Sequence, residues 1–250
     1  MGKNKLRKFE EINALNNVVQ CTFKDELPSP DGHQFRGQWN KQLFGNENPL
    51  VLELGCGKGE YSIELARIFP NKNFIGIDIK GARIWKGAKE ADKDKITNVA
   101  FLRTRIEFLN FFFAEKEIEE IWLTFPDPQM KKNTKRLTSS FFMKQYASVL
   151  KPNGIVHLKT DSNFQYQYTK ALVEKNNLSI VEQHQNIYDQ AQNTILTNIK
   201  TYYEKQWLDR GITIKYIAFS LDKKQQEWQE PDIDIEPDKY RSFGRSAKDL

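Results

Sequence analysis

The sequence predicts an α/β fold built on a doubly wound, mostly parallel sheet. Three observations predict this fold. From residue 49 onward, short apolar runs alternate with helical patterns. These runs are almost continuously apolar, as expected for strands that are covered on both faces. A glycine-rich turn joins the first run to the first helical pattern. With 250 residues, of which 39% are hydrophobic, the chain can form one such domain with appendages.

The elements follow in a regular order. Apolar residues at spacings of three to four predict an amphipathic helix within residues 1–20, and a loop rich in Pro, Gly and Asn follows over residues 28–48. We expect the first five strands at residues 50–54, 73–79, 99–103, 118–125 and 154–160. We expect the helices of this part at residues 60–69, 82–91, 106–114, 139–150 and 163–176.

The C-terminal part completes the sheet. A strand near residues 178–183 and a helix near 198–210 precede the run 212–221, which alternates with period two and is expected to run antiparallel. The sequence therefore divides into a basic helix with its connecting loop (1–48), a main domain (49–221) and an acidic, loosely packed tail (222–250).

Composition excludes several classes of protein. No apolar stretch approaches the roughly 20 residues of a membrane helix, and no secretory signal is recognisable, so we expect a cytoplasmic protein without a membrane partner. Two cysteines are too few for a disulfide scaffold, and the three histidines lack metal-ligand spacing, so no metal is expected.

Charge is unevenly distributed along the chain. The net charge is +5, although residues 222–239 hold seven acidic and only three basic residues. The rest of the chain is therefore strongly basic, which favours a polyanionic partner such as nucleic acid. A solvated, lysine-rich surface is the alternative interpretation.

The glycine-rich turn carries the first functional signal. Gly55, Gly57 and Gly59 follow the first strand directly, and glycines there allow a ligand to approach the backbone. Glu53 just before the turn would repel a phosphate but suits a cationic ligand such as S-adenosylmethionine. Asp78, at the end of the second strand, is placed to accept hydrogen bonds from ribose hydroxyls. NAD remains the competing ligand, because its ribose would use the same acid.

A second signal follows the fourth strand, in the motif FPDP (125–128). Two prolines stiffen this turn, which presents Asp127 at the carboxyl end of a parallel strand, where open α/β sheets bind ligands. A basic run follows directly and could neutralise RNA phosphates; its cations are Lys131, Lys132, Lys135 and Arg136. A merely solvated loop is the alternative.

Together these motifs resemble the bacterial tRNA (guanine-N7)-methyltransferase family of class I, S-adenosylmethionine-dependent enzymes. The resemblance is carried by LELGCGKGE (52–60), IGID (75–78), FPDP with KK and KRLT (125–138), HLKTD (157–161) and TYYEKQW (201–207). It implies a Rossmann-like sheet of seven strands whose last strand is antiparallel. It also implies methyl transfer to N7 of the variable-loop guanine at tRNA position 46.

The resemblance also implies roles for single residues. Cofactor-binding positions are Glu53, Gly55, Gly57, Asp78 and Asp127, and Asp127 is also the candidate catalytic residue. Arg105 stands where the family has an Asp beside the adenine, so backbone amides of Arg105 and Ile106 are the expected contacts. Substrate-binding positions are Lys131, Asp161, Thr201 and Glu204. The family often has Trp where this chain has Gln129.

Two other functions stay open at this point. The chain could methylate another RNA or a small molecule, or it could be a catalytically silent RNA-binding module. The retained acids Glu53, Asp78 and Asp127 argue against a silent module, which has no need of them. The sequence does not decide between a monomer and a homodimer.

Overall fold

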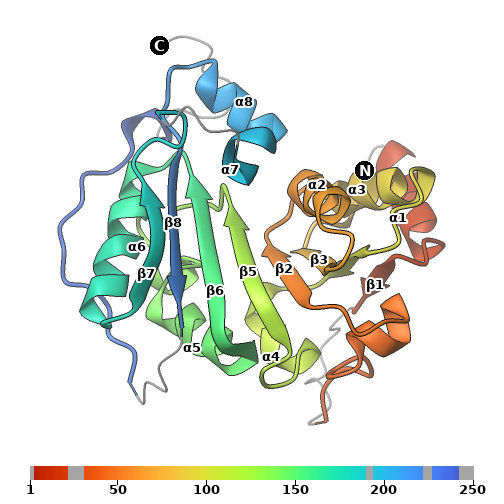
Figure 1. Ribbon diagram of the computed structural model, residues 1–250. Coiled ribbons are helices and arrows are strands. Elements are labelled where there is room, and N and C mark those ends of the chain that lie inside the picture. Colours follow the sequence, from red (N-terminus) through yellow and green to blue (C-terminus); the bar gives the residue numbers. More distant parts are fainter. Residues whose placement is uncertain (1–2, 22–30, 190–193, 222–226, 242–250) are drawn as a thin grey trace.

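The computed structural model describes residues 3–21, 31–189, 194–221 and 227–241, and these form one sheet with helices on both faces (Figure 1). Within the described residues the sheet has eight strands in the order β1-β4-β3-β2-β5-β6-β8-β7. Their bounds are β1 Val18–Gln20, β2 Leu50–Leu54, β3 Asn73–Asp78, β4 Val99–Arg103, β5 Ile118–Thr124, β6 Leu150–Thr160, β7 Ser179–His184 and β8 Lys215–Ser220. Only β8 runs antiparallel to both of its neighbours, which confirms the predicted mostly parallel sheet with an antiparallel last strand.

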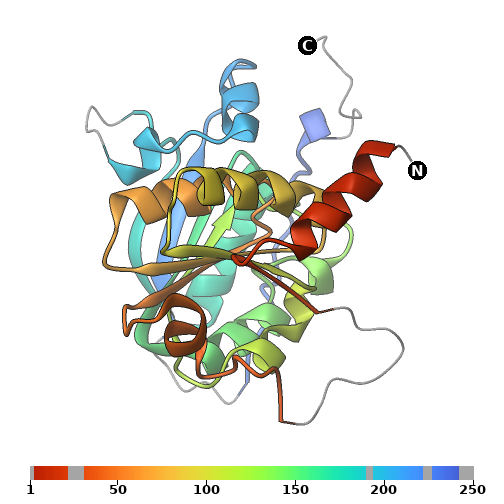
Figure 2. The same ribbon diagram turned by 90° about the vertical axis from the view of Figure 1, so that its right-hand side faces the viewer.

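The strand count differs from the predicted seven because of β1. The N-terminal helix α1 (Lys3–Asn13) ends before the apolar pattern does, and Val18–Gln20 pairs in parallel with β4 and forms the edge of the sheet. Two adjacent β-branched valines favour a strand at that point. Helix α1 lies beside α3 (Figure 2). The Trp85 indole N–H of α3 donates to Glu11 of α1 at 2.8 Å.

Two layers of helices cover the sheet. Helices α1, α2 (Glu60–Ile68) and α3 (Gly81–Lys93) lie on one face, and α4 (Leu109–Phe112), α5 (Ser140–Val149) and α6 (Asn163–Lys175) lie on the other (Figure 2). Helices α7 (Ile195–Asn198) and α8 (Tyr202–Leu208) lie beyond the carboxyl ends of β5 and β6 (Figure 1). None of the helices in the described ranges is long and apolar enough to cross a membrane.

Three local predictions differ from the structure. The single helix expected over 106–114 is a 3₁₀ turn at Ile106–Phe108 followed by the short α4. The helix expected over 198–210 is interrupted, since α7 ends at Asn198 and α8 begins at Tyr202. The loop expected over 28–48 contains a helical turn at Asn40–Phe44 in its described part.

The acidic tail also differs from its prediction. Over residues 227–241 it is packed rather than loose: Trp228 and Ile235 contact the core, and the Glu230 carboxylate accepts a hydrogen bond from the Ser140 amide at 2.8 Å. Apolar residues are sparse in this segment, and polar contacts supplement the core contacts of Trp228 and Ile235. The division of the chain at residues 48 and 221 stays a prediction.

The first testable prediction concerns Gly59, which begins α2 with a φ of +71°. A Cβ at this position would lie 2.3 Å from Cε1 of Phe101, whose ring is buried and cannot move aside. We expect Gly59→Ala to lower the free energy of unfolding by about 2–4 kcal/mol, from the left-handed backbone and the overpacking together. Urea denaturation measures the loss.

Gly45→Ala is the matched control for this prediction. Gly45 has a φ of +66°, and a Cβ there would meet no atom within 4 Å. The control therefore keeps the backbone penalty of about 1–2 kcal/mol without the clash. Equal losses in the two variants would contradict the proposed close packing of Gly59 against Phe101.

Candidate active site

The glycine turn after β2 has the open shape that a ligand requires. The amides of Gly55 and Cys56 donate to the Ile77 carbonyl at 2.8 and 3.0 Å, which ties the turn to the end of β3. Gly55 and Gly57 have φ values of +78° and +58°, and a Cβ on either would meet no atom closer than 4.0 Å. The space beside these two residues is therefore open, and the backbone there is accessible to a bound molecule.

Asp78 lies beside this turn, as the sequence predicts. One carboxylate oxygen accepts from the Gly57 amide at 3.0 Å, and the other accepts from the Lys80 amide at 2.7 Å. A carboxylate has about four acceptor sites, so these two bonds orient the group and leave capacity for ligand hydroxyls.

Glu53 lies beneath the turn and is almost fully buried, at 4% exposure. Its carboxylate accepts from the Ser62 amide at 2.9 Å and from the Thr124 hydroxyl at 2.5 Å, so it joins α2 to the end of β5. Burial raises the pKa of Glu53 to about 7, although the hydrogen bonds from Ser62 and Thr124 oppose this shift. A cation nearby would favour the ionised form.

The FPDP turn presents Asp127 to solvent at the end of β5. Phe125 and Gln129 have φ values of 50° and 47°, so two residues that are not glycine adopt the left-handed conformation on either side of the aspartate. The Gln129 amide donates to the Asp127 carboxylate at 3.0 Å, and the Phe125 amide donates to the Lys159 carbonyl at 2.8 Å. The turn is therefore rigid. Because β2 and β5 are neighbours, Asp127 follows the strand next to the glycine turn.

Arg136 is not available to RNA, which corrects one prediction. Its guanidinium is buried, at 3% exposure, and donates to the carbonyls of Pro128 and Gln129 at 2.9 and 3.1 Å. It also lies 3.8 Å from the centre of the Tyr168 ring. A planar group with several donors suits this enclosed position. Arg136 thus holds the FPDP turn from behind.

The lysines of the basic run differ from Arg136. Lys131, Lys132 and Lys135 are exposed, as the sequence predicts, and the Lys135 ammonium lies 3.9 Å from the carboxylate of Glu107. They follow the FPDP turn directly, so a polyanion bound near Asp127 could reach them. Their contact with RNA stays a prediction.

The three other predicted substrate-binding residues lie below the surface. Asp161, at the end of β6, is 1% exposed and accepts a hydrogen bond from the Tyr240 hydroxyl at 2.7 Å. Thr201 caps α8 by accepting from the Glu204 amide at 3.2 Å. Glu204 is fully buried. These residues support the wall beside the FPDP turn, and their direct contact with substrate stays a prediction.

Lys159 is a site residue that sequence reasoning missed. Its ammonium is fully buried and donates to the carbonyls of Leu196 and Ile199 at 2.6 and 3.0 Å and to Glu204 at 2.8 Å. The Tyr188 hydroxyl donates to the second oxygen of Glu204 at 2.7 Å. Burial lowers the pKa of Lys159, and the Glu204 carboxylate opposes this. The sequence signal that could have identified Lys159 is the position of a lysine within an apolar strand.

The backbone amides expected near adenine follow β4. Arg105 is exposed, precedes the 3₁₀ turn at Ile106–Phe108, and places its guanidinium 3.6 Å from Glu107. Asp78 pairs with Arg103 across β3 and β4, so this turn and Asp78 lie at the same end of the sheet. The contact of Arg105 and Ile106 with adenine stays a prediction.

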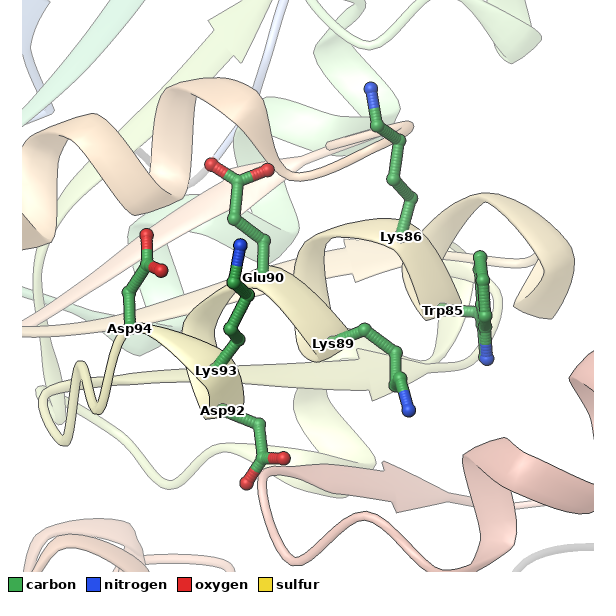
Figure 3. A pocket seen from close by; sticks show the side chains of 7 residues that line it. All are labelled: Trp85, Lys86, Lys89, Glu90, Asp92, Lys93 and Asp94. Atoms are coloured by element: carbon green, nitrogen blue, oxygen red, sulfur yellow. The ribbon is translucent and has the colours of Figure 1, made fainter.

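A separate hollow lies on the outer side of α3 (Figure 3). Trp85 and charged side chains of both signs from residues 86–94 line it, and none of the predicted site residues takes part. The candidate active site is therefore assigned to the strand ends and not to this hollow.

Solved structures identify the fold. The fold matches that of the 16S rRNA methyltransferase KamB with a TM-score of 0.57 at 14% identity, covering 75% of this chain and 94% of that one. It also matches a 30S ribosomal methyltransferase from an uncultured bacterium with a TM-score of 0.54 at 18% identity, covering 81% and 98%. The fold is therefore that of the class I methyltransferases.

Sequence relatives identify the family. Residues 47–217 match the family model described as "Putative methyltransferase". The chain is 52% identical to the tRNA (guanine-N7)-methyltransferase of Bacteroides fragilis over 99% of this chain and 97% of that one, and 55% identical to that of Porphyromonas gingivalis over 95% and 98%. The chain belongs to the tRNA (guanine-N7)-methyltransferase family, which confirms the resemblance found in its motifs.

The second testable prediction concerns the titration of Glu53. In the folded protein its pKa is about 7, against an ordinary value of 4.5, so between these pH values the folded state holds a proton that the unfolded state releases. The free energy of unfolding therefore falls as pH rises through this window, by at most about 3 kcal/mol from Glu53. Glu53→Gln should remove this fall.

Denaturation of both proteins at pH 5, 6, 7 and 8 tests this prediction. Other acids titrate equally in the two proteins, so the difference between them isolates Glu53. Curves that run parallel across the whole range would show that its pKa is not raised.

Proposed function

We propose that the chain transfers a methyl group from S-adenosylmethionine to N7 of the variable-loop guanine at position 46 of tRNA. The observation that carries this proposal is the rigid, exposed carboxylate of Asp127 on the turn after β5, whose neighbour β2 ends in the open glycine turn. Membership of the family supports the choice of substrate. The cytoplasm is the compartment we propose, since tRNA substrates are found there.

The residues around the glycine turn suit S-adenosylmethionine. This molecule supplies a methyl group on an electrophilic sulfonium, and it carries positive charge and no phosphate. Glu53 and Asp78 place two carboxylates at the turn, and the space beside Gly55 and Gly57 is open. Asp78 would hold the ribose hydroxyls, and the amides of Arg105 and Ile106 would contact the adenine.

Asp127 suits the chemistry of guanine N7. This nitrogen already has an in-plane lone pair, so no base needs to deprotonate it, and positioning can supply much of the acceleration. The guanine ring gains positive charge as the methyl group is transferred, and a fixed carboxylate nearby stabilises that charge. We assign Asp127 to orient the guanine through its N–H edge and to offset this charge.

The target base must be accessible to this turn. In A-form RNA the N7 edge lies in a deep, narrow groove that side chains do not enter, so a loop base or an extruded base is required. Lys131, Lys132 and Lys135 would bind the phosphates around it.

The third testable prediction concerns activity and Asp127. Unmodified tRNA incubated with the protein and S-adenosylmethionine should gain one methyl group at N7 of the variable-loop guanine, located by mapping the methylated base. Asp127→Ala should lower kcat about 100-fold, because it removes a charge aimed at the transition state. Asp127→Asn should lose less, since it keeps an acceptor oxygen.

Asp92 is an exposed acid on α3, and Asp92→Asn is the control. This variant should keep the kcat of the parent protein. Near-normal turnover in both Asp127 variants would remove this residue from the mechanism. Methylation of another base or another molecule would contradict the proposed substrate.

The fourth testable prediction separates Lys132 from Arg136. Lys132 is exposed, so Lys132→Ala should lower the slope of log affinity against log salt by about 1 for tRNA binding. Arg136 is buried, so Arg136→Lys should leave this slope unchanged and should lower kcat through a loosened FPDP turn. Measuring tRNA affinity at several salt concentrations gives both slopes. Equal slope changes would contradict the assignment of Arg136 to the turn.

A further inference from the structure

Residues 227–241 form a segment that we name the C-terminal strap. It runs along the outer side of α6 and reaches the neighbourhood of α8 (Figure 1). Asn176 at the end of α6 exchanges two hydrogen bonds with the backbone of Gln229, at 2.8 and 2.9 Å. The Glu230 carboxylate accepts from the Ser140 amide and from the Tyr168 hydroxyl. These contacts fix the first half of the strap to α5 and α6.

Asp238 fixes the second half beside the FPDP turn. It is buried, at 6% exposure, and accepts from the Phe164 amide at 3.1 Å and from the Ser162 hydroxyl. Its own amide lies 3.3 Å from the sulfur of Met130, which belongs to the loop that follows Asp127. Asp238 therefore joins the start of α6 to that loop.

Tyr240 connects the strap to the two remaining parts of this wall. Its hydroxyl donates to the Asp161 carboxylate at 2.7 Å, and its ring lies 5.3 Å from the Trp207 ring of α8 at an angle of 67°. Edge-to-face contact of this kind fixes a ring in place. The strap thus contacts the loop after β5, the end of β6 and α8.

We propose that Asp238 and Tyr240 are positioning residues for the guanine side of the reaction. This inference rests on the proposed function. Lys131, Asp161 and Thr201 lie on three separate segments, and the strap contacts all three segments, so it sets their relative placement. Small displacements of groups that orient a substrate are expensive in rate.

Burial gives Tyr240 a role that Asp161 cannot fill alone. Asp161 is 1% exposed in the presence of the strap, so it orients Tyr240 and the end of β6 from below. The Tyr240 ring is partly exposed and lies above it. Tyr240 is therefore the partly exposed residue that links the buried Asp161 to the strap.

Tyr240→Phe tests this inference, because it keeps the ring and removes the hydroxyl that donates to Asp161. We expect kcat/KM for tRNA to fall about tenfold, a loss typical of one hydrogen bond to a charged group. The affinity for S-adenosylmethionine should stay within twofold, and the melting temperature should fall by about 2–4 °C for each kcal/mol that the lost bond contributes to stability. In a double-mutant cycle, Tyr240→Phe should add nothing to Asp161→Ala, which removes the acceptor of the same bond.

Glu230→Gln is the matched control at the other end of the strap. It weakens the bonds to Ser140 and Tyr168, so it should lower the melting temperature and leave kcat/KM for tRNA within twofold. If both variants lose activity in proportion to their loss of melting temperature, the strap has only a structural role. Unchanged or increased activity in Tyr240→Phe would overturn the inference, an increase identifying the strap as an obstructing lid. If the parent protein itself does not methylate tRNA, the proposed function fails and not the strap alone.

Discussion

The buried ammonium of Lys159 is the constraint on which the substrate side of this protein depends. A charge removed from water is tolerated only when it is fully paired, and Lys159 uses Glu204 and two carbonyls for this purpose. Those partners belong to α7, the residue after it and α8. Moving these two helices away from β6 would therefore leave the Lys159 ammonium buried without partners. The carbonyl of the same lysine accepts from Phe125 at the start of the FPDP turn. One residue of β6 thus fixes both sides of the candidate site.

Three carboxyl groups around the site have different properties because their surroundings differ. Glu53 is enclosed, and burial raises its pKa. Asp78 is held by two backbone amides at the rim of the glycine turn. Asp127 faces solvent on a turn that Arg136 stabilises from behind. The three carboxyl groups therefore extend from the interior to the surface of the candidate site.

Sequence patterns predicted most of the sheet, because continuous apolar runs and a glycine turn are local signals of buried parallel strands. They also placed Glu53, Asp78 and Asp127, which lie at or just beyond the carboxyl ends of strands. The sequence patterns failed to predict features that depend on tertiary contacts. Arg136 is indistinguishable from its neighbouring lysines in sequence, and only the fold encloses it between Pro128 and Tyr168. Asp238 and Tyr240 lie in a segment whose polar sequence does not predict packing, since hydrogen bonds supply much of what holds it.

The short strand β1 has a consequence for behaviour in solution. A parallel sheet that ended at β4 would expose a row of unpaired amides and carbonyls. Such an edge can pair with another chain and promote aggregation. Val18–Gln20 occupies that row. Three residues are too few to serve as a good template for another chain, so the added strand acts as a protective border. Removing the N-terminal segment should therefore lower the solubility of this protein more than its catalytic activity.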